Sequence, residues 1–219
     1  MLKYSMISAV VLAAGDSVRM KSVKPLLLWK GLPFIEHVCA ALRFAGIKDR
    51  AVVLGRRHAD ILKKWQPQGE KIAVNPNPDD GQLSSLRAGL ELLRSTGGIS
   101  SSGGLLICLA DQPLIKPETF AAVCQCWKQH KDSIIIPRVP RPCRKPGESP
   151  FKRGHPIILP AAAVHLCCAG PLDKGLHWVT HHPSVKIFDL DVDDNAVIRD
   201  FDTPEAYSAL LAEEKEVSK

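Results

Sequence analysis

An apolar run that ends in small residues and is followed by basic residues lies near the N-terminus, in segment 10–24 (VVLAAGDSVRMKSVK). Its beginning predicts a buried strand, because short continuous apolar runs are typical of strands covered on both faces. After the strand, small residues let a ligand approach the main chain, whose N–H groups can surround an anion. The residues of this turn are Leu12, Ala13, Ala14 and Gly15. Because Arg19 and Lys24 then add fixed positive charge, the arrangement predicts a triphosphate-binding site.

A single aspartate, Asp111, follows the apolar run 105–109, in the sequence Leu-Ala-Asp-Gln-Pro. A carboxylate at the end of a strand can hold a Mg²⁺ ion that bridges phosphate oxygens, although aspartate is also common in turns. Ligands of parallel α/β sheets bind beyond the carboxyl ends of the strands. Because Asp111 is expected at the same edge as the first loop, we favour the metal-binding role.

Two more acids near the C-terminus, Asp200 and Asp202, stand in the sequence 199–205 (RDFDTPE). Alternate residues of an extended chain share a face, so one of the two can complete a metal site with Asp111. A helix that begins at Thr203 explains the same sequence differently, since acids also favour helix N-termini. Both explanations can hold together.

A helix start that carries a glycine and two serines lies at 81–89 (GQLSSLRAG). The N–H and hydroxyl groups at such a position can contact a base or a phosphate, although an ordinary capped helix with a solvated arginine has the same pattern. The candidate nucleotide-binding residues here are Asp80, Gly81, Ser85 and Arg87.

Strand-like and helix-like segments alternate along the chain. Strands are expected over 7–12, 51–54, 72–74, 105–109, 133–136, 157–159 and 185–188, and helices over 33–45, 58–65, 84–93, 117–129 and 203–212. Continuous apolar strands between helices predict a mostly parallel sheet covered on both faces. The fold class is therefore α/β, a Rossmann-like three-layer sandwich, and we expect one domain over 1–219.

The net charge of +6 is unevenly distributed. Segment 138–153 holds six basic residues and one acid, whereas segment 189–205 holds seven acids and one base. Nucleic-acid binders usually combine basic residues with aromatic ones, and aromatic residues make up only 5% of this chain. We therefore expect no nucleic-acid partner and assign the basic segment 138–153 to an anionic small molecule.

The seven cysteines lack the spacing of a zinc site. Free thiols predict a reducing, cytoplasmic environment, and no apolar run is long enough to span a bilayer. Sequence motifs of P-loop hydrolases, dinucleotide-dependent oxidoreductases, zinc proteases and serine hydrolases are missing.

In order, these motifs resemble those of the MobA-like NTP transferases, and are most similar to the molybdenum cofactor cytidylyltransferase (MocA-type) branch. The resemblance runs from the first loop through GQLSSLRAG and LADQP to RGHP at 153–156 and DFDTPE at 200–205. It departs from the family at Lys21, where glycine is usual, and at Ala206, where an acid is usual.

The resemblance implies a fold of the nucleotide-diphospho-sugar transferase type and a Mg²⁺-dependent enzyme. That enzyme would transfer CMP from CTP to the phosphate of molybdopterin and release pyrophosphate. Arg19 and Lys24 would act on the pyrophosphate, Asp111 with Asp200 or Asp202 would hold the metal, and His155 would line the acceptor side.

Several alternatives remain open. A guanylyltransferase of the same cofactor and a sugar- or alcohol-phosphate nucleotidyltransferase share the chemistry. A non-catalytic chaperone, which would deliver the molybdenum cofactor to an apo-molybdoenzyme, does not share this chemistry. Release of pyrophosphate would separate the last from the others.

Overall fold

The computed structural model describes residues 6–15, 20, 22–100, 103–141, 145 and 147–217. Within these residues an eight-stranded sheet has the order β10-β7-β9-β6-β1-β4-β5, and β8 pairs with β7. The strands of this sheet are β1 (Ile7–Ala13), β4 (Asp49–Leu54), β5 (Lys71–Val74), β6 (Gly104–Leu109), β7 (Ser133–Pro140), β8 (Phe151–Arg153), β9 (Ile157–Pro160) and β10 (Lys186–Asp191). A separate hairpin consists of β2 (Leu28–Trp29) and β3 (Leu32–Pro33).

Most neighbouring strands run parallel, as expected. Strand β1 lies between β4 and β6 and is parallel to both, and the pairs β4–β5 and β7–β10 are also parallel. Strand β9 runs antiparallel to β6 and β7. The residues just before β9 therefore lie at the edge where the parallel strands end.

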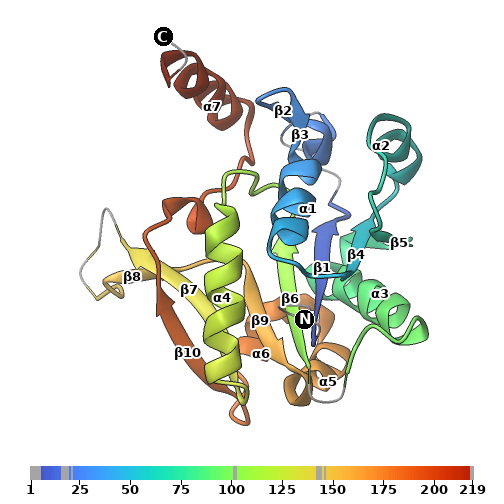
Figure 1. Cartoon of the computed structure of the whole chain (residues 1–219), viewed down its shortest axis with the longest axis vertical. Coiled ribbons are helices and arrows are strands. Elements are labelled where there is room, and N and C mark those ends of the chain that lie inside the picture. Colours follow the sequence, from blue (N-terminus) through green and yellow to red (C-terminus); the bar gives the residue numbers. More distant parts are fainter. Residues whose placement is uncertain are drawn as a thin grey trace.

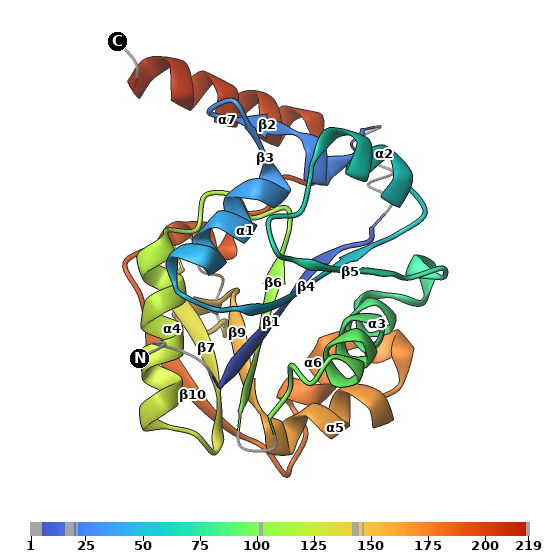
Figure 2. The ribbon, with the colours of Figure 1, turned by 45° about the vertical axis from the view of Figure 1, so that its right-hand side comes forward.

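Helices cover both faces of the sheet. Figure 2 shows α1 (Phe34–Phe44) and α4 (Pro117–Gln129) on one side and α3 (Gln82–Ser95), α5 (Ala161–Ala169) and α6 (Gly175–Thr180) on the other. Side chains of β1 alternate between them, so that Ala9 and Val11 pack toward α1 and Val10 and Leu12 toward α3. This three-layer arrangement confirms the predicted fold class. The short helix α2 (His58–Lys64) follows β4.

The last helix, α7 (Pro204–Val217), lies at the end of the molecule that also holds the β2–β3 hairpin (Figure 1). Thr203 caps it, since its hydroxyl accepts a hydrogen bond from the N–H of Ala206. The buried ring of Phe201 packs against Phe34 of α1, with 5.5 Å between ring centroids. This contact fixes the segment that carries the acids before α7.

The structure contains elements that the sequence did not predict, among them β8 and the β2–β3 hairpin, and it extends others. Strand β7 continues to Pro140, beyond the predicted end at 136, so Arg138 lies in a strand rather than in a loop. Helices α5 and α6 were not predicted, because α5 is apolar all round and α6 has only six residues. No helix among the described residues is long and apolar enough to cross a bilayer.

Candidate active site

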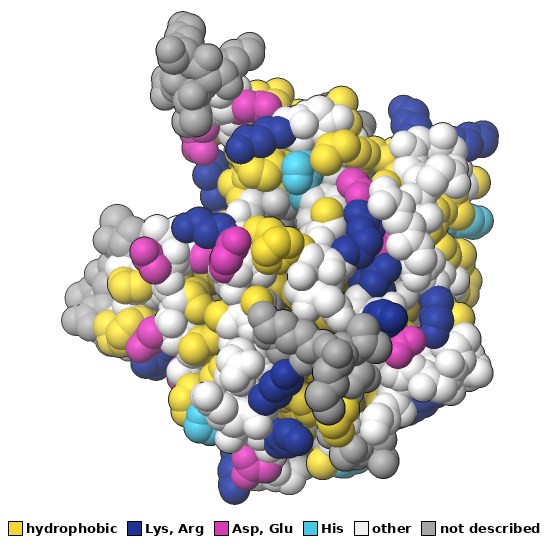
Figure 3. Space-filling view, in the orientation of Figure 1, with side chains coloured by type: hydrophobic (Ala, Val, Ile, Leu, Met, Phe, Trp, Pro, Cys, Tyr) yellow, Lys and Arg dark blue, Asp and Glu magenta, His cyan; other side chains and the backbone are white. Residues whose placement is uncertain are grey.

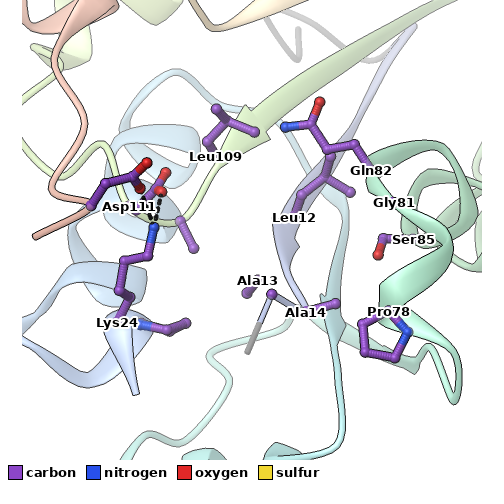
Figure 4. Close-up of a pocket in the computed structure, with 14 residues that line it drawn as sticks. Leu12, Ala13, Ala14, Lys24, Pro78, Gly81, Gln82, Ser85, Leu109 and Asp111 are labelled. Carbon is purple, nitrogen blue, oxygen red and sulfur yellow. Dashed lines mark hydrogen bonds and ion pairs between the residues drawn. The ribbon is translucent and has the colours of Figure 1, made fainter. Parts of the chain in front are cut away.

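A cleft of about 350 Å³ opens at the carboxyl ends of β1 and β6. Figure 4 shows Lys24 and Asp111 on one side of it, α3 on the other, and the end of β1 between them. Its lining residues are Leu12, Ala13, Ala14, Gly15, Lys24, Pro25, Pro78, Gly81, Gln82, Ser85, Leu109, Ala110, Asp111 and Asp202. Residues predicted from four separate motifs therefore share one cavity.

The back of the cleft is formed by close contact between strand ends. The N–H of Ala110 donates to the carbonyl oxygen of Leu12, 3.0 Å away. Gly55, just after β4, approaches so closely that a Cβ there would lie 2.2 Å from the carbonyl oxygen of Ala14. Sequence reasoning missed Gly55, although a glycine directly after the predicted strand 51–54 was a usable signal.

Lys24 and two carboxylates form the charged side of the cleft. The Nζ atom of Lys24 donates to Oδ2 of Asp111 at 2.9 Å and also to Oδ1 of Asp202. Burial alone would lower the pKa of Lys24, but the charges and hydrogen bonds of Asp111 and Asp202 outweigh it and raise that pKa. The side chains are 16, 23 and 32% exposed, respectively, so solvent screens the pairs only in part.

Asp200 lies near this cluster but does not line the cleft. Burial, and then the negative charges of Asp202 and Asp111, raise the pKa of Asp200 above its usual value. The side chain of Phe201 between the two acids is buried. Of the two candidate partners for Asp111, the geometry favours Asp202.

On the opposite side, Asn75 ties the loop before α3 to the helix. Its side-chain amide donates to the hydroxyls of Ser84 and Ser85, and its Oδ1 accepts from the N–H of Asn77. Ser85 and Gly81 are thereby held at the cleft, next to the positively polarised start of α3.

Besides Asp200, three residues predicted to contact the nucleotide or its pyrophosphate are not placed in the cleft. Arg19 lies outside the described residues. Asp80 is exposed and does not line the cavity. Arg87 donates to the carbonyl oxygens of Cys167 and Gly170 at the end of α5, so its guanidinium joins two helices rather than facing the nucleotide cleft. This contact depends on α5, which was not predicted from the sequence.

The charges of the basic segment 138–153 are partly compensated. Arg138 pairs with Asp189 and Asp191, and Arg153 with Asp189. Figure 3 shows acidic and basic side chains side by side in this part of the surface, over β7, β8 and β10. These pairs join two of the six basic residues of segment 138–153 to two of the seven acids of segment 189–205, and they weaken the interpretation of 138–153 as an anion site.

His155 lies beside the cleft rather than in it, in a second cavity of about 310 Å³. Gln82 lines both cavities. The N–H of His155 donates to the carbonyl oxygen of Val197, and a Cβ on Gly154 would lie 2.0 Å from that same oxygen. Burial lowers the pKa of His155 to about 4, although the charge of Asp111 acts in the opposite direction, so the imidazole is neutral at pH 7.

The carboxylate oxygens of Asp111 and Asp202 suit a Mg²⁺ ion whose other ligands include phosphate oxygens. No group of three or more His, Cys, Asp or Glu side chains suited to a metal was found in the described part of the chain. Mg²⁺ commonly uses one or two carboxylates and completes its shell with water and phosphate oxygens. The carboxylates of Asp111 and Asp202 already share one cation, the ammonium of Lys24.

A family model for the MobA-like NTP transferase domain matches residues 9–184, which include both the β1 loop and the aspartate after β6. The chain belongs to this family. Among curated relatives, the bifunctional protein GlmU of Aquifex aeolicus (strain VF5) is 32% identical over 114 residues. That of Allorhizobium ampelinum (strain ATCC BAA-846 / DSM 112012 / S4) is 33% identical over 131 residues. The matches cover 51 and 58% of this chain but 24 and 28% of the relatives, so the chain spans about a quarter of their length.

Solved structures share the fold over nearly the whole chain. Rv0371c from Mycobacterium tuberculosis H37Rv has a TM-score of 0.78 at 24% identity, covering 95% of this chain and 98% of that chain. A complex of Rv0371c with manganese has a TM-score of 0.74 at 23% identity, covering 94 and 98%. A nucleotidyl transferase from Methanothermobacter thermautotroptrophicus (Mth528) has a TM-score of 0.72 at 21% identity, covering 97 and 99%.

Proposed function

We propose that this protein is a nucleotidyltransferase that transfers CMP from CTP to the phosphate of molybdopterin and releases pyrophosphate. The observation that carries the transferase assignment is the convergence of Lys24, Asp111 and Asp202 on a cleft beside the small-residue end of β1. Family membership supports the same chemistry. CTP and molybdopterin rest on the resemblance of the motifs to the cytidylyltransferase branch.

In the proposed reaction, an oxygen of the acceptor phosphate attacks the α-phosphorus of the nucleotide. The bond from that phosphorus to the oxygen bridging to the β-phosphate breaks, and pyrophosphate leaves with the bonding electron pair. Catalysis of such a step requires positioning and stabilisation of negative charge. No side-chain nucleophile is needed.

We assign a separate role to each group of residues in the cleft. The main chain of Ala13 to Gly15 and the start of α3 bind the phosphates, and Lys24 stabilises charge on the pyrophosphate. Asp111 and Asp202 would hold Mg²⁺, which would supply positive charge to the phosphates. A divalent metal is supported by the acidic donor pair and by the manganese complex of the structural neighbour Rv0371c.

Pyrophosphate release tests the proposal with four nucleotides, CTP, GTP, ATP and UTP, each paired with molybdopterin or with glucose 1-phosphate. We expect the highest rate for CTP with molybdopterin. A preference for GTP would make the protein a guanylyltransferase, and a preference for the sugar phosphate would replace the acceptor. Binding of molybdopterin without release from any nucleotide would support the chaperone alternative instead.

A further inference from the structure

The cavity beside His155 has features that the transfer step does not use. It is lined by apolar side chains from three elements, Ile136 of β7, Ile157 of β9 and Leu176 of α6. The Nε2 atom of His155 is buried and lacks a hydrogen-bonding partner in the described structure. A buried polar atom without a partner is costly, and a ligand in this cavity can supply the missing hydrogen bond.

A pair of stacked imidazoles on α6 also lines this cavity. The rings of His177 and His181 have centroids 3.8 Å apart and planes inclined by 15°. Nδ1 of His181 lies 2.9 Å from the carbonyl oxygen of His177, so Nδ1 carries a hydrogen and donates it to that oxygen, which holds the ring in place. Both residues are exposed, so the pair offers a flat surface to a planar ligand.

The cavity offers little to a charged group. Arg153 is the one permanently charged residue among those described as lining it, and Asp189 engages its guanidinium at 2.7 and 2.9 Å. The His155 imidazole is neutral because of its burial. The lining thus favours an uncharged ligand that is partly apolar and carries hydrogen-bonding groups.

We propose that this second cavity binds the planar, uncharged heterocycle of the acceptor and that His177 and His181 determine which acceptors are used. This rests on the proposed function, because the acceptor phosphate must reach the first cleft. Gln82 lines both cavities, so a ligand seated against α6 can extend its phosphate past Gln82 toward Asp111. The proposal therefore places recognition of the ring in the second cavity and the reaction of the phosphate in the first cleft.

The test measures binding of 6-hydroxymethylpterin, an uncharged fluorescent heterocycle without a phosphate, to the full chain without nucleotide. We expect saturable quenching of its emission, because stacking on imidazole quenches fluorescence. His181→Ala and His177→Ala should each weaken binding by about two- to tenfold, the effect of losing an aromatic contact. His165→Ala is the matched control, since His165 is exposed on α5 and hydrogen-bonds the carbonyl oxygen of Ala162 in its own helix.

The outcomes distinguish this inference from the proposed function, since binding needs no turnover. Absence of saturable binding, or equal affinity in the two α6 variants and the control, overturns the inference even if pyrophosphate is released. If cytidine displaces the pterin, the cavity binds the nucleotide base. If glucose 1-phosphate displaces the pterin and cytidine does not, the cavity binds a sugar phosphate rather than a planar ring. Either result overturns the inference. The far-ultraviolet circular dichroism of each variant shows that it is folded, and if His181→Ala unfolds, His177→Ala decides.

Discussion

Replacing Lys24 by methionine should change metal binding and catalysis in opposite directions. In the structure the ammonium of Lys24 forms ion pairs with the carboxylates of Asp111 and Asp202. A divalent cation that binds to these carboxylates must therefore displace the ammonium. Each hydrogen bond to a charged group contributes about 1.5–3 kcal/mol. Partial burial of all three side chains keeps these bonds above the value of a surface ion pair.

Without the ammonium, a divalent cation binds with no competitor. Because about 1.4 kcal/mol corresponds to a factor of ten, even one displaced bond predicts Mn²⁺ binding roughly tenfold tighter in Lys24→Met. The same change removes the cation assigned to the pyrophosphate. Loss of such a group lowers the rate by roughly 10²–10³.

Two measurements check this prediction. Mn²⁺ is titrated without nucleotide and followed by the electron paramagnetic resonance signal of the free ion, and pyrophosphate release is measured at saturating nucleotide. Lys186→Met is the matched control, since Lys186 pairs with Asp132 on the exposed surface. If Lys24→Met binds Mn²⁺ no more tightly than the wild type, the ammonium does not occupy the metal position and the reasoning fails.

Asp111, Phe201 and Glu70 each make contacts whose loss can be measured. Asp111→Asn should lower pyrophosphate release by orders of magnitude with folding intact, because it removes a metal ligand; Asp132→Asn, on the surface, should leave the rate unchanged, and equal rates in both would contradict the assignment. Phe201→Ala should reduce the free energy of unfolding by about 3–5 kcal/mol in urea titrations, because its ring is fully buried. A loss below about 1.5 kcal/mol, which is the usual cost of a volume-conserving core change, would show that the ring does not anchor the segment. Burial alone would raise the pKa of Glu70, but hydrogen bonds from the Gln68 main chain and from arginines outweigh it and lower that pKa. Glu70 therefore stabilises the fold above its unfolded pKa, and this contribution is lost as pH falls through the lower folded pKa. Glu70→Gln should cost about 3–5 kcal/mol at pH 7 and flatten the decline of stability in acid, as thermal unfolding from pH 7 to pH 3 can measure.

Much of the fold was predictable because its signals are local. The helix over Pro117–Gln129 was predicted to the residue, since Pro117 marks the first turn and the pattern stops at Gln129. Strands β1 and β6 were found from their apolar runs. The edge rule for parallel sheets then predicted that the ends of these two strands would meet.

Contacts between segments that are distant in the sequence were harder to predict. The Lys24–Asp202 pair joins residues 178 positions apart, and the sequence offered Asp200 and Asp202 as equal candidates. Packing of Phe201 against Phe34 orients the segment that carries both acids. The role of Arg87 depended on α5, which has no amphipathic pattern by which it could be recognised.

The sequence by itself determined the alternation of strands and helices, the small-residue loop and the charged residues available to a phosphate ligand. Those features depend on side chains within a few positions of one another. Tertiary structure decided the antiparallel direction of β9, which brings His155 to the edge where β6 ends, and it brought the α6 imidazoles to the same cavity. Strand direction and helix position follow from which surfaces pack together, and the residues that form those surfaces are far apart in the chain.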